Sequence, residues 1–165
     1  MSMVPSNTRI TPFLWFDGNA EEAVNFYCSV FKNSRRLDKM DSAVDTTVPK
    51  GKVITISFEL DGQAFVALNG GPNFKFTEAI SFMIRCENQD EIDYYWSKLT
   101  ANGGSEVQCG WLKDKFGLSW QVVPSQIAEL VASAKGMEAM MRMKKLNIEE
   151  LKRANQPLKS GAAEA

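Results

Sequence analysis

Apolar and polar residues follow two patterns in this chain, and each pattern occurs in both halves. Over residues 20–31, apolar residues recur at three- and four-residue spacing, which predicts a helix with one buried face. Residues 52–60 alternate strictly, which predicts a half-buried strand, and Asp61-Gly62 predicts a hairpin turn into a strand over 63–68. The second half has the same plan, with a helix predicted over 89–101 and a strand over 118–123.

A degenerate internal repeat supports this duplication. The segment 19–27 returns as 88–96, with Asn on Asn, Glu on Glu and two aromatic residues on two aromatic residues. Asn19 and Asn88 each precede a helix and are each followed three residues later by Glu, so both are predicted to cap their helices. An apolar run precedes each copy at the same offset, over 11–16 and 80–85. The repeated unit is therefore predicted to be strand, turn and helix.

The remaining apolar runs complete two similar modules. Short strands are predicted over 35–40, 80–86, 105–108 and 111–116, and helical stretches over 126–134, 136–145 and 148–154. The predicted class is α+β, with two modules of one strand, one helix and three strands. The predicted single domain covers 8–155 and consists of module 8–71, module 77–124 and a C-terminal helical segment 125–155, with a flexible tail over 156–165.

Charge and hydropathy exclude several classes of partner. The chain of 165 residues has 19 basic and 20 acidic residues, and its pI is about 5.6. This near-balance gives no basic surface for nucleic acid. No apolar run approaches the roughly 20 residues of a membrane span, and no signal-peptide pattern opens the chain. We therefore expect a soluble, cytoplasmic protein without nucleic acid or membrane partners.

The inventory of reactive residues limits the possible chemistry. The sequence contains no histidine, which removes the commonest metal ligand and general base, and with it Ser-His and Cys-His nucleophile pairs. The cysteines Cys28, Cys86 and Cys109 form an odd count without a close pair, so we interpret them as small apolar core residues. Met137, Met140, Met141 and Met143 are interpreted as packing residues against the sheet or a second subunit.

Three segments carry a resemblance to a known family. Residues 12–23 (PFLWFDGNAEEA), 109–124 (CGWLKDKFGLSWQVVP) and 140–146 (MMRMKKL) resemble the vicinal oxygen chelate superfamily of glyoxalases, bleomycin-resistance proteins and dioxygenases. The narrower resemblance, over residues 9–155, is to the PhnB-like group named 3-demethylubiquinone-9 3-methyltransferase. The block Trp111, Asp114, Gly117, Trp120 and Gln121 is specific to that group.

The resemblance implies a fold, an assembly and a cavity. Each module is expected to curl its sheet into a half-barrel with helices outside and a ligand cavity on the concave face, and two chains are expected to form a homodimer. Alternation along the strands then assigns side chains to the two faces. Those expected to face the helices are Phe13, Trp15, Ile54, Ile56, Phe58, Phe65, Phe82, Ile84, Trp120 and Val122. Those expected to face the cavity are Leu14, Phe16, Thr55, Ser57, Glu59, Val66, Leu68, Ser81, Met83, Arg85, Ser119 and Gln121.

The resemblance also implies where a metal would bind. Aligned on helix and turn landmarks, the four ligand positions of metal-dependent members are Pro12, Val66, Ser81 and Gln121. Only Gln121 is able to ligate, through a neutral oxygen, whereas a catalytic divalent ion needs about three His or carboxylate ligands. Glu59 adds a carboxylate only if it faces inward, and an exposed strand-end glutamate is the competing interpretation. We therefore expect no metal, with an unconventional metal-dependent lyase or dioxygenase as an alternative.

The group's name implies methyl transfer from S-adenosylmethionine, which the glycines do not support. That cofactor is usually held by a glycine-rich loop after the first strand of a parallel sheet. Here Gly70-Gly71 precedes a Pro-containing linker, and Gly103-Gly104 ends a helix. We expect no cofactor, and an O-methyltransferase remains the second alternative.

The predicted function is binding of a small organic ligand in a metal-free cavity. The candidate ligand-binding residues are Gln121, Ser81, Ser119, Ser57, Arg85 and Glu59, and no catalytic residue is assigned. The serines and Gln121 offer hydrogen bonds, and Arg85 offers an ion pair to an anionic group. The competing interpretation is that the serines satisfy nearby backbone and that Arg85 extends to solvent.

Overall fold

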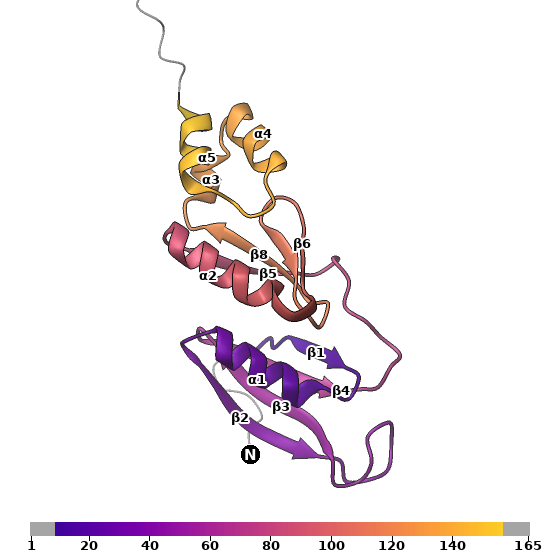
Figure 1. Ribbon diagram of the computed structural model, residues 1–165. Coiled ribbons are helices and arrows are strands. Elements are labelled where there is room, and N and C mark those ends of the chain that lie inside the picture. The colour runs from indigo at the N-terminus through magenta and orange to yellow at the C-terminus, as the bar shows by residue number, and fades with distance from the viewer. Residues whose placement is uncertain (1–8, 157–165) are drawn as a thin grey trace, which may run out of the picture. The chain divides into compact units, whose positions relative to one another are not determined.

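The computed structural model describes residues 9–156 (Figure 1) and divides the chain into two compact units. The first unit comprises Met1–Phe76 and the second Thr77–Ala165. Each contains one four-stranded sheet with a helix on it.

The first unit is a βαβββ module. Its sheet has the order β1-β4-β3-β2, in which β1 and β4 are parallel and the other neighbours are antiparallel. The helix α1 packs on β3 and β4. In chain order the elements are β1 (Phe13–Phe16), α1 (Ala20–Val30), β2 (Ser34–Asp41), β3 (Val53–Leu60) and β4 (Gln63–Asn69).

The second unit repeats this topology and adds three helices. Its sheet has the order β5-β8-β7-β6, again with one parallel pair, β5 and β8. Its elements are β5 (Phe82–Cys86), α2 (Gln89–Thr100), the 3-10 turn η1 (Ala101–Gly103), β6 (Ser105–Glu106), β7 (Trp111–Lys113), β8 (Ser119–Pro124), α3 (Ile127–Leu130), α4 (Ala134–Arg142) and α5 (Ile148–Asn155). The predicted α+β class with two βαβββ modules is confirmed. Of the predicted tail, residues 157–165 lie outside the described part.

An aromatic stack fixes which face of the first sheet meets α1. Tyr27 of α1 and Phe58 of β3 are fully buried, and their rings stack with centroids 6.2 Å apart. Phe65 stacks on Phe58 in turn, with centroids 5.4 Å apart. We call this side of a sheet the helix face and the opposite side the far face. The predicted helix-facing positions Ile56, Phe58 and Phe65 are thus confirmed, whereas Ile54 lies at a register shift between β2 and β3.

On β1 the predicted faces were wrong, and the connecting turn explains why. Leu14 and Phe16 lie on the helix face and are buried, whereas Phe13 is 56% exposed on the far face together with Trp15. Three residues separate β1 from α1, but only two separate β5 from α2. The additional residue is Gly18, whose φ of +80° suits glycine. Because strand side chains alternate, one additional residue exchanges the two faces.

The two predicted helix caps also differ. Asn88 Oδ1 accepts a hydrogen bond of 3.0 Å from the Glu91 backbone N–H, as predicted. The Asn19 side chain makes no such bond. The Ala20 N–H instead donates to Asn69 Oδ1, at 3.0 Å, from the end of β4. The prediction for Asn19 was therefore wrong, because a residue distant in sequence takes over the cap.

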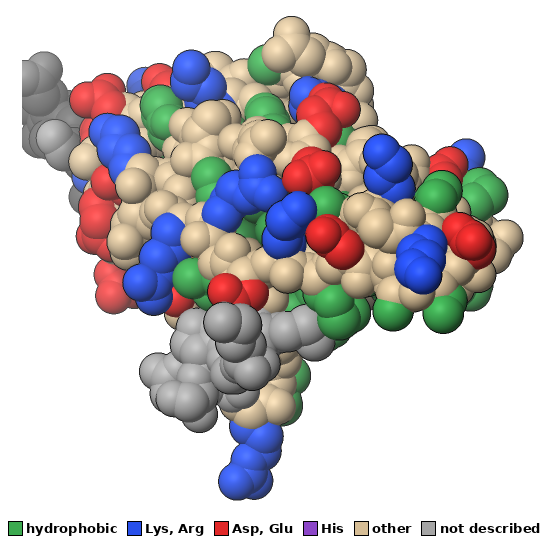
Figure 2. Space-filling view, turned by 90° about the horizontal axis from the view of Figure 1, so that it is seen from below, with side chains coloured by type: hydrophobic (Ala, Val, Ile, Leu, Met, Phe, Trp, Pro, Cys, Tyr) green, Lys and Arg blue, Asp and Glu red, His purple; other side chains and the backbone are tan. Residues whose placement is uncertain are grey.

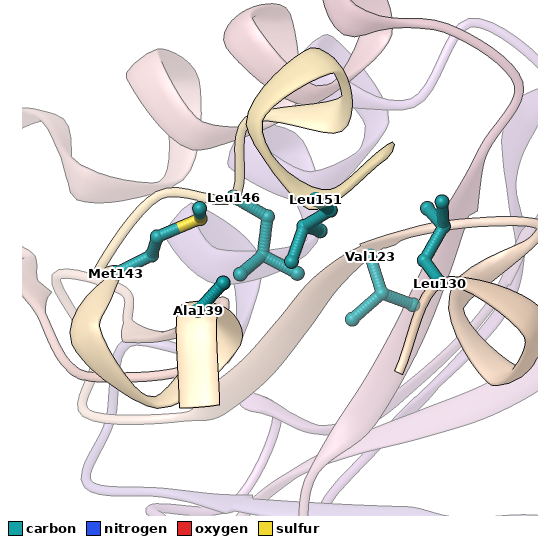
Figure 3. Close-up of a cluster of buried hydrophobic side chains, with 6 residues drawn as sticks. All are labelled: Val123, Leu130, Ala139, Met143, Leu146 and Leu151. Carbon is teal, nitrogen blue, oxygen red and sulfur yellow. The ribbon is translucent and has the colours of Figure 1, made fainter. Parts of the chain in front are cut away.

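The C-terminal helices of the second unit enclose their own apolar cluster (Figure 3). The cluster brings together one β8 residue with residues of α3, α4 and α5 and of the segment joining α4 to α5. Met140 packs against it, Met137 is 40% exposed and Met141 is 60% exposed, so the methionines are only partly packing residues. The cluster consists of Val123, Leu130, Ala139, Met143, Leu146 and Leu151.

Charged residues of both signs are interspersed on the face shown in Figure 2. Ion pairs also flank the edge strand β2, where Arg35 meets Glu59 at 3.1 Å and Arg36 meets Glu21 at 3.4 Å. Within residues 9–156, no helix has both the length and the apolar character needed to cross a bilayer.

Candidate ligand-binding site

The far face of the second sheet carries a connected set of predicted polar residues. Gln121 lies opposite Met83 of β5 on one side and Trp111 of β7 on the other. Two residues earlier on β8, Ser119 lies opposite Lys113. Because residues in register point to the same face, these side chains share one surface.

Two of the candidates are bonded to each other. Gln121 Nε2 donates a 2.8 Å hydrogen bond to Ser81 Oγ, which joins β8 to the residue before β5. The bond holds the Gln121 amide against the sheet while the side chain stays partly exposed. The structure therefore brings Ser81 and Gln121 together, as the prediction of a shared far face required.

Ser119 is the most unusual residue of this set. It is 1% exposed, and its Oγ has no hydrogen-bond partner among the described residues. An unsatisfied buried hydroxyl costs about 1–3 kcal/mol, so such groups are rare in folded proteins. The Ser119 hydroxyl is thus buried and makes no hydrogen bond to the described residues, either as a donor or as an acceptor.

Sequence reasoning missed two neighbours of these residues. Trp111 is half-buried beside Gln121, and Lys113 lies beside Ser119 with its Nζ in an ion pair with Glu78. Both belong to β7, whose three residues are too short to show alternation. Only the pairing of β7 with β8 locates these two residues. That pairing follows from the conformation of the loop between the strands, which the sequence pattern does not show.

Arg85 lies two residues beyond Met83 on β5, opposite Val123. Its side chain is exposed, and no carboxylate of the described residues pairs with it. The structure thus places Arg85 on the predicted face but at its solvent-accessible end, which leaves its binding role a prediction.

Ser57 and Glu59 lie on the far face of the first sheet. Ser57 is 2% exposed, and its Oγ also has no partner among the described residues. Glu59 Oε2 accepts a 3.1 Å hydrogen bond from Arg35, its neighbour across the β2–β3 pair. Only 18% of the Glu59 side chain is exposed, against 64% of the Arg35 side chain. Glu59 is therefore neither a free carboxylate nor the exposed strand end of the competing interpretation.

A buried carboxylate fixes the loop that joins β7 to β8. Asp114 Oδ1 accepts from the backbone N–H groups of Phe116 and Leu118, at 2.9 and 3.1 Å, and Oδ2 accepts from Trp120 Nε1 at 2.9 Å. Gly117 supplies a positive φ of +85° in the same loop. This network sets the register that places Ser119 beside Lys113. The group-specific block at 111–121 therefore has a structural explanation.

A pocket of about 440 Å³ lies elsewhere, in the first unit, and was not predicted from the sequence. It is lined by residues of the loop between β2 and β3 and by residues around the start of α1. Its polar lining includes Glu21, Lys52 and Thr47, and Val48 and Pro49 also line it. The side chain of Asn69 also lines it, but both ends of that amide are bonded, to Ala20 N and Val53 O.

The described residues do not fit the cofactor or the metal that the family resemblance implies. Gly70 packs under the Trp15 ring, and the Gly71 carbonyl accepts from Trp15 Nε1 at 2.8 Å, so this glycine pair serves a packing role. Gly104 closes against the carbonyls of Leu99 and Lys113. Neither pair forms a phosphate-type loop between a strand and a helix. Among residues 9–156, no three His, Cys, Asp or Glu side chains converge to hold a metal ion.

The cysteines of the described part show no sign of activation. All three are free thiols. Burial raises the pKa of Cys86 to about 12, with smaller contributions from the nearby Glu91 and Glu87 carboxylates. Burial also raises the pKa of Cys28. Raised values disfavour the reactive thiolate.

Comparison with known proteins defines the class. A PhnB protein from Bacillus cereus, described as a candidate 3-demethylubiquinone-9 3-methyltransferase, is 36% identical, with a TM-score of 0.63 over 70% of this chain and 99% of that chain. Protein PA1353 from Pseudomonas aeruginosa is 21% identical (TM-score 0.58; 72% of this chain and 98% of that chain). The fosfomycin resistance protein FosX from Listeria monocytogenes is 14% identical (TM-score 0.51; 72% and 92%). The last two similarities concern the fold alone.

The fold is therefore that of the vicinal oxygen chelate proteins, with two βαβββ modules in one chain. The model of the family described as 3-demethylubiquinone-9 3-methyltransferase matches residues 8–123. This chain belongs to that family, as its resemblance to the PhnB-like group predicted. No curated protein matches the chain. The family match ends at the last residues of β8, so the C-terminal helices lie beyond it.

Proposed function

We propose that this protein binds a small organic molecule without a metal ion, on the far face of the second sheet. The main support for the proposal is the buried Ser119 Oγ, which has no hydrogen-bond partner within residues 9–156 and lies two residues before the Ser81-bonded Gln121 on β8. A ligand hydroxyl or carbonyl at this position would satisfy Ser119 and recover the free energy lost by its burial. Gln121 retains its Oε1 as an acceptor for the same ligand.

The surroundings favour an aromatic ligand. Trp111 stands in register with Gln121, and Met83 lies on the other side of Gln121 with 47% of its surface exposed. Aromatic and thioether side chains provide favourable contacts to a flat ring. Apolar walls with a few directed polar groups are typical of small-molecule sites. A phenol, or a similar ring carrying one hydrogen-bonding group, matches this arrangement.

The expected assembly and location form part of the proposal. We infer a cytoplasmic homodimer whose functional domain spans residues 8–155. Light scattering coupled to gel filtration tests the assembly, because a mass near 37 kDa, twice the 18.4 kDa of one chain, is expected. A mass near that of one chain would contradict it.

Removing the Ser119 hydroxyl tests the proposal. Ser119→Ala should raise the free energy of unfolding of the ligand-free protein by about 1 kcal/mol, because it removes an unsatisfied buried group. The same variant should bind 4-ethylphenol more weakly than the wild type, with affinity followed by tryptophan fluorescence. Gln121→Leu should also weaken this binding.

Ser97→Ala is the matched control. Ser97 is exposed on α2 and donates to the Tyr94 carbonyl, so its removal should change stability by less than about 0.5 kcal/mol and leave binding unaltered. If Ser119→Ala destabilises the protein instead, the hydroxyl has a structural partner in solution and the proposal loses its main support.

An alternative function is methyl transfer to a quinol, which only the family name favours. Titration calorimetry with S-adenosylmethionine separates it from the proposed binding function. Saturable heat would support the transferase. No heat across a wide concentration range would remove it.

A further inference from the structure

The C-terminal helical segment lies next to the proposed ligand site, although it is outside the family match. Val123 follows Gln121 by two residues on β8 and therefore shares its far face. Val123 is only 4% exposed, because it belongs to the cluster formed with Leu130, Leu146 and Leu151 (Figure 3). Two residues of a strand span about 6.6 Å. Val123, the first residue of the cluster, thus lies next to Gln121 on the same face of β8, toward the end of the strand.

Backbone hydrogen bonds fix the segment in this position. The Cys109 N–H donates to the Met143 carbonyl at 2.7 Å, and the Gly110 N–H donates to the Lys144 carbonyl at 2.8 Å. These bonds attach the connection between α4 and α5 to the residues directly before β7. Since β7 carries Trp111, the attachment lies beside the same ligand site.

Gly110 makes this close approach possible. A Cβ built on Gly110 would lie 2.9 Å from the Val122 carbonyl and 3.1 Å from Leu146 side-chain atoms. Its φ of +80° also requires glycine. Leu146 is fully buried as a result. The chain therefore uses a glycine to admit a leucine at the end of the site.

The start of α2 provides a second attachment. Gln89 Nε2 donates to the Leu146 carbonyl at 3.1 Å, and Gln89 Oε1 accepts from the Ile148 N–H at 3.0 Å. Lys145 Nζ pairs with Asp93 at 2.6 Å. The segment around Leu146 is thus hydrogen-bonded both to the residues before β7 and to the start of α2.

We propose that the segment 125–155 forms the end wall of the ligand site and determines its length, with Leu146 as the residue that sets the limit. The inference rests on the proposed function, since it concerns the same site. The wall is apolar, so the part of the ligand that reaches it is an alkyl or aryl end. The hydrogen-bonding group of the ligand lies at Gln121 and Ser119.

A series of 4-alkylphenols, from methyl to heptyl, tests the wall. For the wild-type full chain, affinity measured by tryptophan fluorescence should rise with alkyl length and then fall sharply once the chain meets the wall. Leu146→Ala removes three side-chain carbons, so the limit should move to alkyl chains that are longer by about two to three carbons. Leu146→Val should move it by about one carbon and serves if the alanine variant does not fold.

Leu99→Ala is the control. Leu99 is fully buried on α2, so this variant removes the same volume from the helix side of the unit. It should leave the length limit unchanged. If phenols bind in a Gln121-dependent way but Leu146→Ala leaves the limit unchanged, the end wall is refuted while the proposed function stands. If no phenol binds the wild type, both fail.

Discussion

The two βαβββ modules share a topology and a register but differ in what their far faces carry. In the first module, the row across the sheet is Phe13, Val66 and Ser57, and in the second it is Met83, Gln121 and Trp111. The amide of Gln121 therefore occupies the position of the apolar Val66. The comparison indicates that the duplicated framework is retained, while the Ser81–Gln121 pair of the proposed ligand site belongs to the second module.

The neighbouring row differs in charge. Glu59 of β3 corresponds to Lys113 of β7, because each lies two residues beyond the equivalent positions Ser57 and Trp111. Each is neutralised by a partner in its own unit, Glu59 by Arg35 and Lys113 by Glu78. In these two rows, the polar residues left for a ligand are thus the uncharged ones, and Arg85 lies beyond them at the exposed end of β5. This favours a neutral hydrogen-bonding group over an ion.

Removing the difference in turn length between the modules should have the largest effect on stability. Deleting Gly18 would give the first module the two-residue connection of the second and exchange the faces of β1. Leu14 and Phe16 would leave the helix face, and the free energy of unfolding should fall by more than about 4 kcal/mol. Urea unfolding followed by circular dichroism measures the loss.

Gly18→Ala is the control for that deletion. No atom lies within 4 Å of a Cβ at this position, so only the positive φ opposes the substitution and the loss should be about 1 kcal/mol. A deletion variant as stable as Gly18→Ala would contradict the explanation of the β1 faces.

The hairpin loops provide the next contrast. Asp114→Asn should cost about 2–3 kcal/mol, because the amide nitrogen of Asn is unable to accept the bond that Trp120 Nε1 donates to the carboxylate. In the first module the corresponding loop is the exposed turn Asp61-Gly62. Asp61→Asn should change stability by less than about 0.5 kcal/mol, since Asn tolerates the φ of +45°. Thermal unfolding compares the two variants, and equal losses would refute the assigned role of Asp114.

Substitutions at the helix caps of the two modules should cause smaller losses of stability. Asn88→Ala should cost about 1 kcal/mol, whereas Asn19→Ala should cost less than about 0.5 kcal/mol because its side chain makes no capping bond. Asn69→Ala should cost about 2 kcal/mol, since it frees both Ala20 N and Val53 O. Urea unfolding of the three variants should give this order. If Asn19→Ala costs as much as Asn88→Ala, the long-range cap is wrong.

The smallest effect concerns the C-terminal segment, which the first module lacks. The Lys145 ammonium beside Asp93, aided by Gln89, holds the pKa of that carboxyl below its ordinary value. A lowered folded-state pKa stabilises the protein above the unfolded-state pKa, and this contribution disappears as the pH falls through the folded-state value. Lys145→Met should therefore flatten the stability curve slightly below pH 5. An unchanged acid limb would indicate that the pair contributes nothing in solution.

The sequence was sufficient for the elements and much of the second module. The alternation of 52–60 and the helical spacing of 20–31 located β3 and α1 to within a residue. Gln121 was also placed on the far face, because residues 118–122 alternate between apolar and polar, and Ser81 was placed there by the strand predicted over 80–86. These features depend on local periodicity, which a single sequence records.

Features that depend on turns and distant partners were not predictable in the same way. The additional residue Gly18 is invisible to an alignment made on the helices, and it reversed the faces of Leu14 and Phe16. The cap from Asn69 comes from 49 residues away. The position of Trp111 required the loop fixed by Asp114. In each case a tertiary contact, rather than a local pattern, decides the outcome.

The central claim is that the second module binds an organic molecule without a metal ion, and native mass spectrometry of the freshly purified protein tests it most directly. We expect an adduct with the mass of a small organic compound that is present in the wild type and reduced in Ser119→Ala and Gln121→Leu. Elemental analysis of the same sample should give less than stoichiometric metal. A stoichiometric divalent ion, or an adduct unaffected by both substitutions, would contradict the claim.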